Sequence, residues 1–148
     1  MHTFSAIYFH IIFSTKNRQE YINPKWQEDL YKYIIGIVKK KGMNVVAIGG
    51  MPDHVHLLLR AKPDCIISDL VRDIKKASTK FAKFQLRASP DFEWQNGYSV
   101  FSVSFSALQD VANYIYNQFQ HHRNYTSEEE LRRYYTKFAM PFPGDEKT

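Results

Sequence analysis

The sequence predicts an α+β fold, with a ferredoxin-like or RRM-like antiparallel sheet, two helices packed on one face and C-terminal helices after it. Four short segments rich in β-branched and aromatic residues are typical of strands. Between them, apolar residues recur at spacings of three and four, which is typical of amphipathic helices. The resulting order, β-α-β-β-α-β-α plus one further helix, favours a sheet covered on one face. The other face is expected to be free for a substrate or a partner.

The first half of the chain supplies three strands and one helix. Residues 4–14 are β-branched and aromatic and predict the first strand. Asn23 and Pro24 predict the start of a helix that ends at the three lysines before Gly42. Residues 44–49 and 54–60 predict the next two strands, joined by a turn that contains two glycines and a proline.

The second half predicts a long helix from about residue 68 to 87, a strand over 98–105 and a helix over 107–122 capped by Ser106. A last helix is expected from Ser127 to Phe138, where Ser127 and Glu130 have the spacing of a capping box. We expect one domain over residues 1–140 and a loose tail over residues 141–148.

The composition favours a nucleic-acid partner. The net charge is +5, and the chain holds 11 Phe, 10 Tyr and 2 Trp. Cations suit phosphates and aromatic rings suit unstacked bases, although a basic protein without that role fits the composition equally well. Cys65 is the single cysteine, which excludes a disulfide framework and suits a reducing cytoplasm. No cationic leader or membrane-spanning run is found, so we expect a cytoplasmic protein.

A His-Val-His sequence is the first candidate for chemistry. Strand side chains alternate, so His54 and His56 are expected on one face and Val55 on the other. Two imidazoles at this spacing can bind one metal ion. Two ordinary, partly buried histidines explain the same pattern.

A tyrosine-bearing helix is the second candidate. Tyr114 and Gln118 are four residues apart, beside the predicted apolar stripe. The tyrosine could point at a metal ion, with the glutamine as a third ligand. Tyr116 and Gln120 have the same spacing, so spacing alone does not choose between the pairs. His121 continues the flank of Tyr114.

The long middle helix carries a basic stripe in which we identify no interleaved acidic partner. Its members recur at spacings of three and four: Arg72, Lys76, Lys80, Lys83 and Arg87. A stripe of one sign favours phosphate contact over a merely solvated face. The sequence has no Walker loop, dinucleotide glycine signature or Gly-x-Ser-x-Gly elbow, and no two-carboxylate hydrolase is indicated.

Four segments together resemble the HUH single-tyrosine transposases (TnpA-type) of bacterial and archaeal insertion sequences, in which HUH means His-hydrophobic-His. The resemblance extends from about residue 4 to residue 122. The segments are His10–Arg18 (HIIFSTKNR), Met51–Leu58 (MPDHVHLL), Trp94–Ser104 with WQNGY and FSVS, and Tyr114–Gln118 (YIYNQ).

The resemblance implies a role for each candidate. His54 and His56 would bind a divalent metal, Mg²⁺ or Mn²⁺, with Gln118 as third ligand and Tyr114 as nucleophile. Lys16 and Arg18 are expected to bind DNA together with the basic stripe. The implied partner is single-stranded DNA with hairpins, cleaved and rejoined through a covalent 5′-phosphotyrosine. The resemblance also implies a homodimer in which one chain supplies the histidines and the other Tyr114.

Three other functions fit part of the pattern. Domesticated transposases of palindromic elements share the motifs and can act as monomers. A noncatalytic RRM-like binding module explains the sheet, the aromatics and the charge, but not the co-facing histidines beside a tyrosine helix. A metal-dependent hydrolase that uses water would leave no covalent protein–DNA product.

Overall fold

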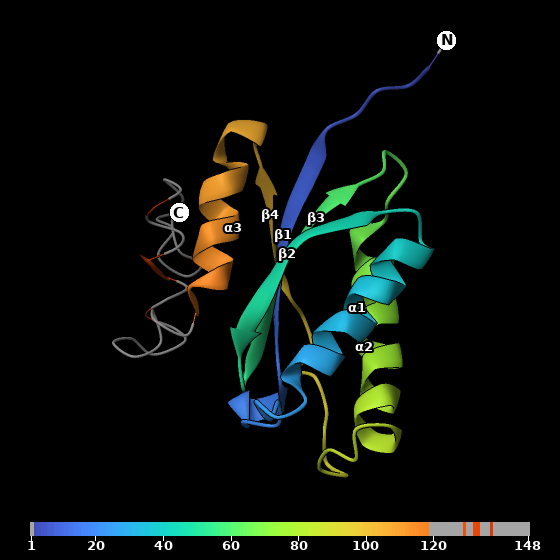
Figure 1. The fold of residues 1–148 in the computed structure, drawn as a ribbon, viewed down its shortest axis with the longest axis vertical. Coiled ribbons are helices and arrows are strands. Elements are labelled where there is room, and N and C mark those ends of the chain that lie inside the picture. The colour runs from blue at the N-terminus through green and yellow to red at the C-terminus, as the bar shows by residue number, and fades with distance from the viewer. Residues whose placement is uncertain (1, 119–128, 130–131, 134–136, 138–148) are drawn as a thin grey trace, which may run out of the picture.

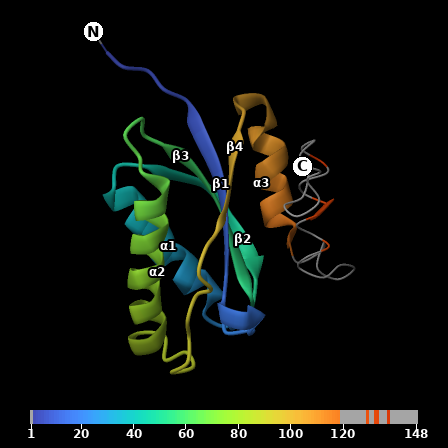
Figure 2. The same cartoon turned by 180° about the vertical axis from the view of Figure 1, so that it is seen from behind.

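The computed structural model describes residues 2–118 and residues 129, 132, 133 and 137. Its core is one antiparallel sheet with the strand order β2-β3-β1-β4. The elements follow one another in the predicted order, and the ferredoxin-like α+β fold is confirmed (Figures 1 and 2). The strands and helices are β1 (Ile7–Ser14), α1 (Gln27–Lys40), β2 (Asn44–Met51), β3 (His54–Ala61), α2 (Ile67–Phe84), β4 (Ser99–Val103) and α3 (Leu108–Tyr116).

Helices α1 and α2 cover one face of the sheet (Figure 1). Strand alternation sends Ile11 and Phe13 of β1, and Val55 and Leu57 of β3, into this layer, where all four are buried. The helices contribute their own apolar stripes, such as Leu30 of α1. This layer is the larger of the two cores, and burial of its apolar surface is the main favourable term in folding.

Helix α3 lies on the opposite face, which corrects the expectation that this face is free (Figure 2). Val111 and Ile115 of α3 pack with Tyr8, Leu58 and other strand residues in a second core. The physical reason is the helix's own apolar stripe, which must be buried against something. The sheet face that carries the histidines is therefore partly covered by α3.

Several boundaries differ from the predicted ones. Helix α1 begins at Gln27, after a turn over residues 24–26 in which the Asn23 side chain accepts a hydrogen bond from the Lys25 backbone N–H at 2.8 Å. Strand β2 continues to Met51, so the turn to β3 is confined to two residues. Ser104, rather than Ser106, caps the short 3-10 helix Phe105–Ala107 that precedes α3.

The end of the predicted 107–122 helix, most of the predicted 127–138 helix and the 141–148 tail lie outside the described residues. So do His121 and Gln120. The domain boundary at residue 140 stays a prediction. Among the described helices, none combines the length and the apolar character needed to cross a membrane.

Candidate active site

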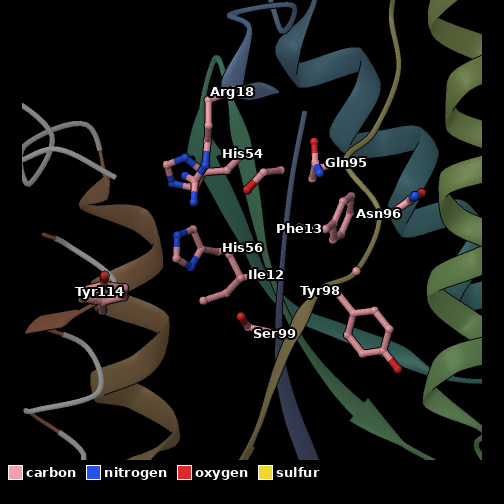
Figure 3. A pocket seen from close by; sticks show the side chains of 12 residues that line it. Ile12, Phe13, Arg18, His54, His56, Gln95, Asn96, Tyr98, Ser99 and Tyr114 are labelled. Atoms are coloured by element: carbon pink, nitrogen blue, oxygen red, sulfur yellow. The ribbon is translucent and has the colours of Figure 1, made fainter. Parts of the chain in front are cut away.

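A pocket of about 210 Å³ opens beside the His-Val-His sequence (Figure 3). Five parts of the chain meet there: β1, the segment after β1, the start of β3, helix α3, and the loop before β4 with the first residue of that strand. The residues that line it are Ile12, Phe13, Ser14, Arg18, His54, His56, Gln95, Asn96, Gly97, Tyr98, Ser99 and Tyr114. Residues far apart in the sequence therefore share one polar cavity.

The two histidines lie on the α3 side of β3, and Val55 lies in the opposite core, as strand alternation predicts. Their rings are 5.0 Å apart between centroids. Each is only 3% exposed. Burial fixes their rings, so the pair presents a preformed set of nitrogen atoms to the pocket.

Each histidine has a partner at Nδ1. His54 Nδ1 lies 2.7 Å from the Asp53 carboxylate, and His56 Nδ1 lies 2.9 Å from His10 Nε2. A carboxylate accepts, so His54 donates from Nδ1 and keeps a lone pair on Nε2 when it is neutral. A nitrogen with a lone pair is the form of imidazole that binds a metal.

Helix α3 and the two residues after it bring Tyr114 and Gln118 close to the histidines. The Tyr114 ring is almost buried and meets His56 edge-on, with 5.8 Å between ring centroids. Gln118 is buried as well, and its Oε1 lies 3.3 Å from His54 Nε2. The Gln118 amide N–H donates to the Tyr114 carbonyl at 3.2 Å, which turns the amide oxygen toward His54.

The geometry separates the two tyrosines that spacing left equivalent. Tyr114 lines the pocket, whereas Tyr116 is 63% exposed and donates its hydroxyl to the Val46 carbonyl of β2 at 3.3 Å. Tyr116 does not line the described pocket. The pair near the histidines is thus Tyr114 with Gln118.

Gly49 lets α3 approach the sheet. It pairs with His56 across β2 and β3, and a Cβ at this position would lie 2.6 Å from the Ile115 carbonyl oxygen. Real Cβ atoms do not approach oxygen so closely, so any larger residue must push α3 away. The position of α3, and with it that of Tyr114, therefore depends on Gly49, which pairs with His56 in the sheet.

The loop before β4 is held as a rigid pocket wall. Trp94 is buried and donates to the Ser78 hydroxyl of α2 at 3.0 Å. Lys75 donates to the carbonyls of Gln95 and Gly97 at 2.8 and 2.6 Å. Burial lowers the pKa of the Lys75 ammonium. Helix α2 thus fixes the wall that faces the histidines.

Arg18 reaches the pocket from the segment after β1 (Figure 3). Asn17 and Arg18 both have left-handed φ values, 55° and 56°, which are uncommon for residues other than glycine. The Asn17 N–H donates to the Gln95 side chain at 3.1 Å, which ties this turn to the pocket wall. Lys16 points elsewhere and pairs with Glu93 at 3.3 Å.

The basic stripe lies on α2 and just beyond it, and one of its members is already paired. Arg72 makes ion pairs with Asp69 and Asp73 at 3.2 and 3.4 Å. The expectation that no acidic partner interleaves is therefore wrong at this position, because residues three apart and next to each other on α2 supply carboxylates. Lys76 and Lys80 are exposed, and they pair with no carboxylate of the described part.

The donor atoms fit a divalent cation. With a proton on Nδ1 of His54, its Nε2 and the Gln118 oxygen are two acceptors that face each other at 3.3 Å. Such a contact is repulsive unless a cation or a proton lies between them. In the described residues, no group of three His, Cys, Asp or Glu side chains forms an alternative cage. The fitting set is His54, His56 and the Gln118 amide.

Comparisons with known proteins identify the family of this chain. The family model of IS200-like transposases matches residues 3–118, which include every pocket residue named above. The chain belongs to the IS200-like transposase family. Enzymes of this family carry out DNA transposition. The ISDra2 transposase TnpA of Deinococcus radiodurans is 30% identical over 118 residues, covering 74% of this chain and 82% of that protein.

Two solved structures resemble this IS200-like transposase. A crystal structure from Deinococcus radiodurans, assigned as a transposase, has a TM-score of 0.62 and 31% identity, over 80% of this chain and 95% of that one. A REP-associated tyrosine transposase bound to a REP hairpin has a TM-score of 0.63 and 18% identity, over 82% and 72%. The second similarity concerns the fold.

Sequence reasoning missed two members of the site. His10 interrupts the apolar run of the first strand, and Asp53 precedes His54, but neither received a role. Alternation predicts that His10 shares a face with Ile12, which lines the pocket. The strand register that brings it next to His56 is not encoded in any local pattern.

Proposed function

We propose that this protein cleaves and rejoins single-stranded DNA with Tyr114 as the nucleophile, assisted by a divalent metal at His54, His56 and Gln118. The observation that carries the proposal is the meeting of Tyr114 and the two histidines at one pocket. A hydroxyl beside a cluster of neutral nitrogen and oxygen donors suits phosphoryl transfer better than simple binding.

The chemistry requires no external energy. The Tyr114 oxygen forms a bond to the scissile phosphorus while the bond from phosphorus to the 3′ oxygen of the preceding nucleotide breaks. The tyrosine proton is lost to solvent, and the leaving 3′ oxygen takes up a proton from solvent. The 5′ phosphate stays on Tyr114, so a 3′-OH can later reverse the step and rejoin DNA. One O–P bond is exchanged for another at each stage.

The residues of the pocket have separate roles in this proposal. The Nε2 atoms of His54 and His56 and the Gln118 oxygen would hold Mg²⁺ or Mn²⁺ without adding negative charge. The bound cation would polarise the scissile phosphate, since free tyrosine, with a pKa of about 10, is a weak nucleophile at neutral pH. Arg18 reaches into the same cavity and would bind phosphate oxygens.

The DNA is proposed to be single-stranded and marked by hairpins. The REP-associated transposase of the same fold is bound to a hairpin, and the net charge of +5 suits a polyanionic partner. The homodimer with shared sites implied by the sequence remains an expectation. Within the single chain described, the Tyr114 ring lies against the His56 ring, so one chain alone can bring both groups to the pocket.

A covalent-trapping assay tests the proposal. Protein is incubated with labelled single-stranded hairpin DNA and Mn²⁺ and run on a denaturing gel. We expect a covalent band from the wild type and from Tyr116→Phe, and none from Tyr114→Phe, because of these two tyrosines only Tyr114 lines the pocket. A loss of at least ~10³-fold is expected when a nucleophile is removed.

The controls separate the rival functions. Tyr114→Phe should still bind the hairpin, since its loss is a single hydroxyl. Cleavage by the wild type without a covalent band would favour a hydrolase that uses water. Binding without cleavage would favour an RRM-like module. A band from Tyr114→Phe but none from Tyr116→Phe would exchange the roles of the two tyrosines.

A further inference from the structure

His10 lies at the centre of β1 and is completely buried. Its Nε2 is 2.9 Å from His56 Nδ1, and the two rings are 5.1 Å apart between centroids. In the register of the sheet His10 pairs with Leu58, so it reaches His56 along the diagonal between neighbouring strands. His10 is absent from the pocket lining, so it is positioned to act on His56 and not on DNA.

A hydrogen bond between two neutral imidazoles requires one donor and one acceptor. If His56 donates from Nδ1, its Nε2 carries a lone pair and can bind a metal. If His10 donates instead, His56 carries its proton on Nε2 and cannot bind there. The direction of this one bond therefore decides whether His56 can serve as a ligand.

We propose that His10 is a positioning residue that accepts the Nδ1 proton of His56 and so keeps the His56 Nε2 available for the metal. This inference rests on the proposed function, which makes His56 a ligand. For His10 to accept at Nε2, its own proton must sit on Nδ1. His10 then fixes both the tautomer and the orientation of the His56 ring.

The neighbouring pair supports this reading. Asp53 holds His54 at Nδ1 in the same way, at 2.7 Å. A carboxylate can only accept, so the His54 tautomer follows from its partner alone. Both histidines of β3 are thus held at Nδ1. Asp53, directly before the strand, holds His54 with its carboxylate, and His10 of β1 holds His56 with its imidazole. A packing role alone would not require a nitrogen of His10 to face a nitrogen of His56.

The test uses two variants of His10 and one control. His10→Phe keeps a ring and removes both nitrogens. His10→Gln places an amide oxygen near the position of Nε2, where it can still accept. Tyr8→Phe is the matched control, since Tyr8 is buried on the same face of β1 two residues away.

Two readouts are measured on the full chain. The first is Mn²⁺ affinity without DNA, followed by electron paramagnetic resonance. The second is the protonated nitrogen of His56, located by ¹⁵N NMR of the metal-free protein. We expect His10→Phe to weaken Mn²⁺ binding by about 10- to 100-fold, the usual effect of losing such a partner. In a fraction of the molecules of this variant, His56 should carry its proton on Nε2 instead of Nδ1.

His10→Gln should restore most of the affinity, and Tyr8→Phe should match the wild type. Equal Mn²⁺ affinity in His10→Phe and wild type would overturn the inference and leave His10 a packing residue. So would wild-type His56 with its proton on Nε2, a measurement that needs no variant to fold. If the wild type binds no Mn²⁺, the proposed metal site fails, while the NMR result still decides how His10 acts.

Discussion

The two faces of the sheet are made from alternate residues of the same strands, yet they bury different chemistry. The face under α1 and α2 buries aliphatic and aromatic side chains such as Ile11 and Leu57. The face under α3 buries His10, His54, His56 and Gln118 beside its apolar residues. Buried polar groups cost free energy unless they are paired. Burial of these polar groups on the α3 face therefore costs stability but forms a site, and burial of apolar side chains on the other face offsets that cost.

The difference also concerns how each face is closed. Two helices of 14 and 18 residues cover the apolar face, whereas within the described residues a helix of nine residues covers part of the polar face beside the pocket. The pocket lies on the α3 face, which is therefore where we propose that the substrate binds.

The largest effect is expected from mixing two inactive variants. A His56→Ala chain and a Tyr114→Phe chain, combined and re-equilibrated, should show no cleavage, because the described structure places both residues in one chain's site. Denaturing gels with labelled hairpin DNA report the product. Recovery of cleavage in mixed dimers of tagged chains would mean that α3 covers the partner's sheet, as the sequence resemblance implies.

Adjacent residues of β3 provide the next test. Leu57→Ala should lower the free energy of unfolding by about 2–5 kcal/mol, since Leu57 is fully buried in the apolar core. Its folded fraction should still cleave DNA. His56→Ala should remove cleavage and lower the free energy of unfolding by about 1–3 kcal/mol, because the buried His10 nitrogen loses its partner.

Urea unfolding followed by circular dichroism gives the stabilities, and the trapping assay gives the activities. Leu57→Ala should show the larger loss of stability, and His56→Ala should show the larger loss of cleavage. If His56→Ala unfolds as readily as Leu57→Ala, the polar face contributes to stability as much as the apolar face, and the division between them fails.

Much of this comparison could be predicted from the sequence. The period of two in 54–60 places His54 and His56 opposite Val55, and the structure agrees. The face that α3 covers could not be predicted. An apolar stripe on a helix shows that one side is buried, but not which surface buries it. For the same reason, residue spacing alone could not show whether Tyr114 or Tyr116 faces the histidines. In the structure, the Tyr116 hydroxyl donates a hydrogen bond to the Val46 carbonyl instead.

The strand register sets the other limit. His10 and His56 are 46 residues apart, and their contact depends on which residues of β1 and β3 stand opposite each other. A shift by one residue would turn every side chain of one strand to the other face. Local patterns fix the face of each strand but not this pairing, so the His10 contact appears only in three dimensions.

A substitution at Gly49 tests how closely α3 must pack on the sheet, and its expected effect is smaller than those above. Gly49→Ala places a methyl group 2.6 Å from the Ile115 carbonyl and must displace the helix. We expect the free energy of unfolding to fall by about 1–3 kcal/mol, typical of overpacking. Cleavage should fall as well, because Tyr114 moves with the helix.

Gly36→Ala is the matched control, since a Cβ at Gly36 of α1 meets no atom within 4 Å. Alanine there should be neutral or stabilising by up to about 1 kcal/mol, because glycine is a poor helix former. The unfolding free energies of the two variants are compared in urea, and the covalent product is compared on gels. Full activity in Gly49→Ala would show that the seat of α3 does not position Tyr114.

The smallest effects are expected on α2, outside both faces, where the basic stripe has paired and exposed members. Lys76→Gln and Lys80→Gln together should reduce the slope of log affinity against log salt by about 0.7–0.9 for each lost phosphate contact. Arg72→Gln should change it less, because Arg72 already pairs with Asp69 and Asp73. Hairpin binding is measured by fluorescence anisotropy at several salt concentrations. An unchanged slope in the double lysine variant would make the stripe a solvated surface. A larger change from Arg72→Gln than from the lysines would mean that DNA displaces the two aspartates from Arg72.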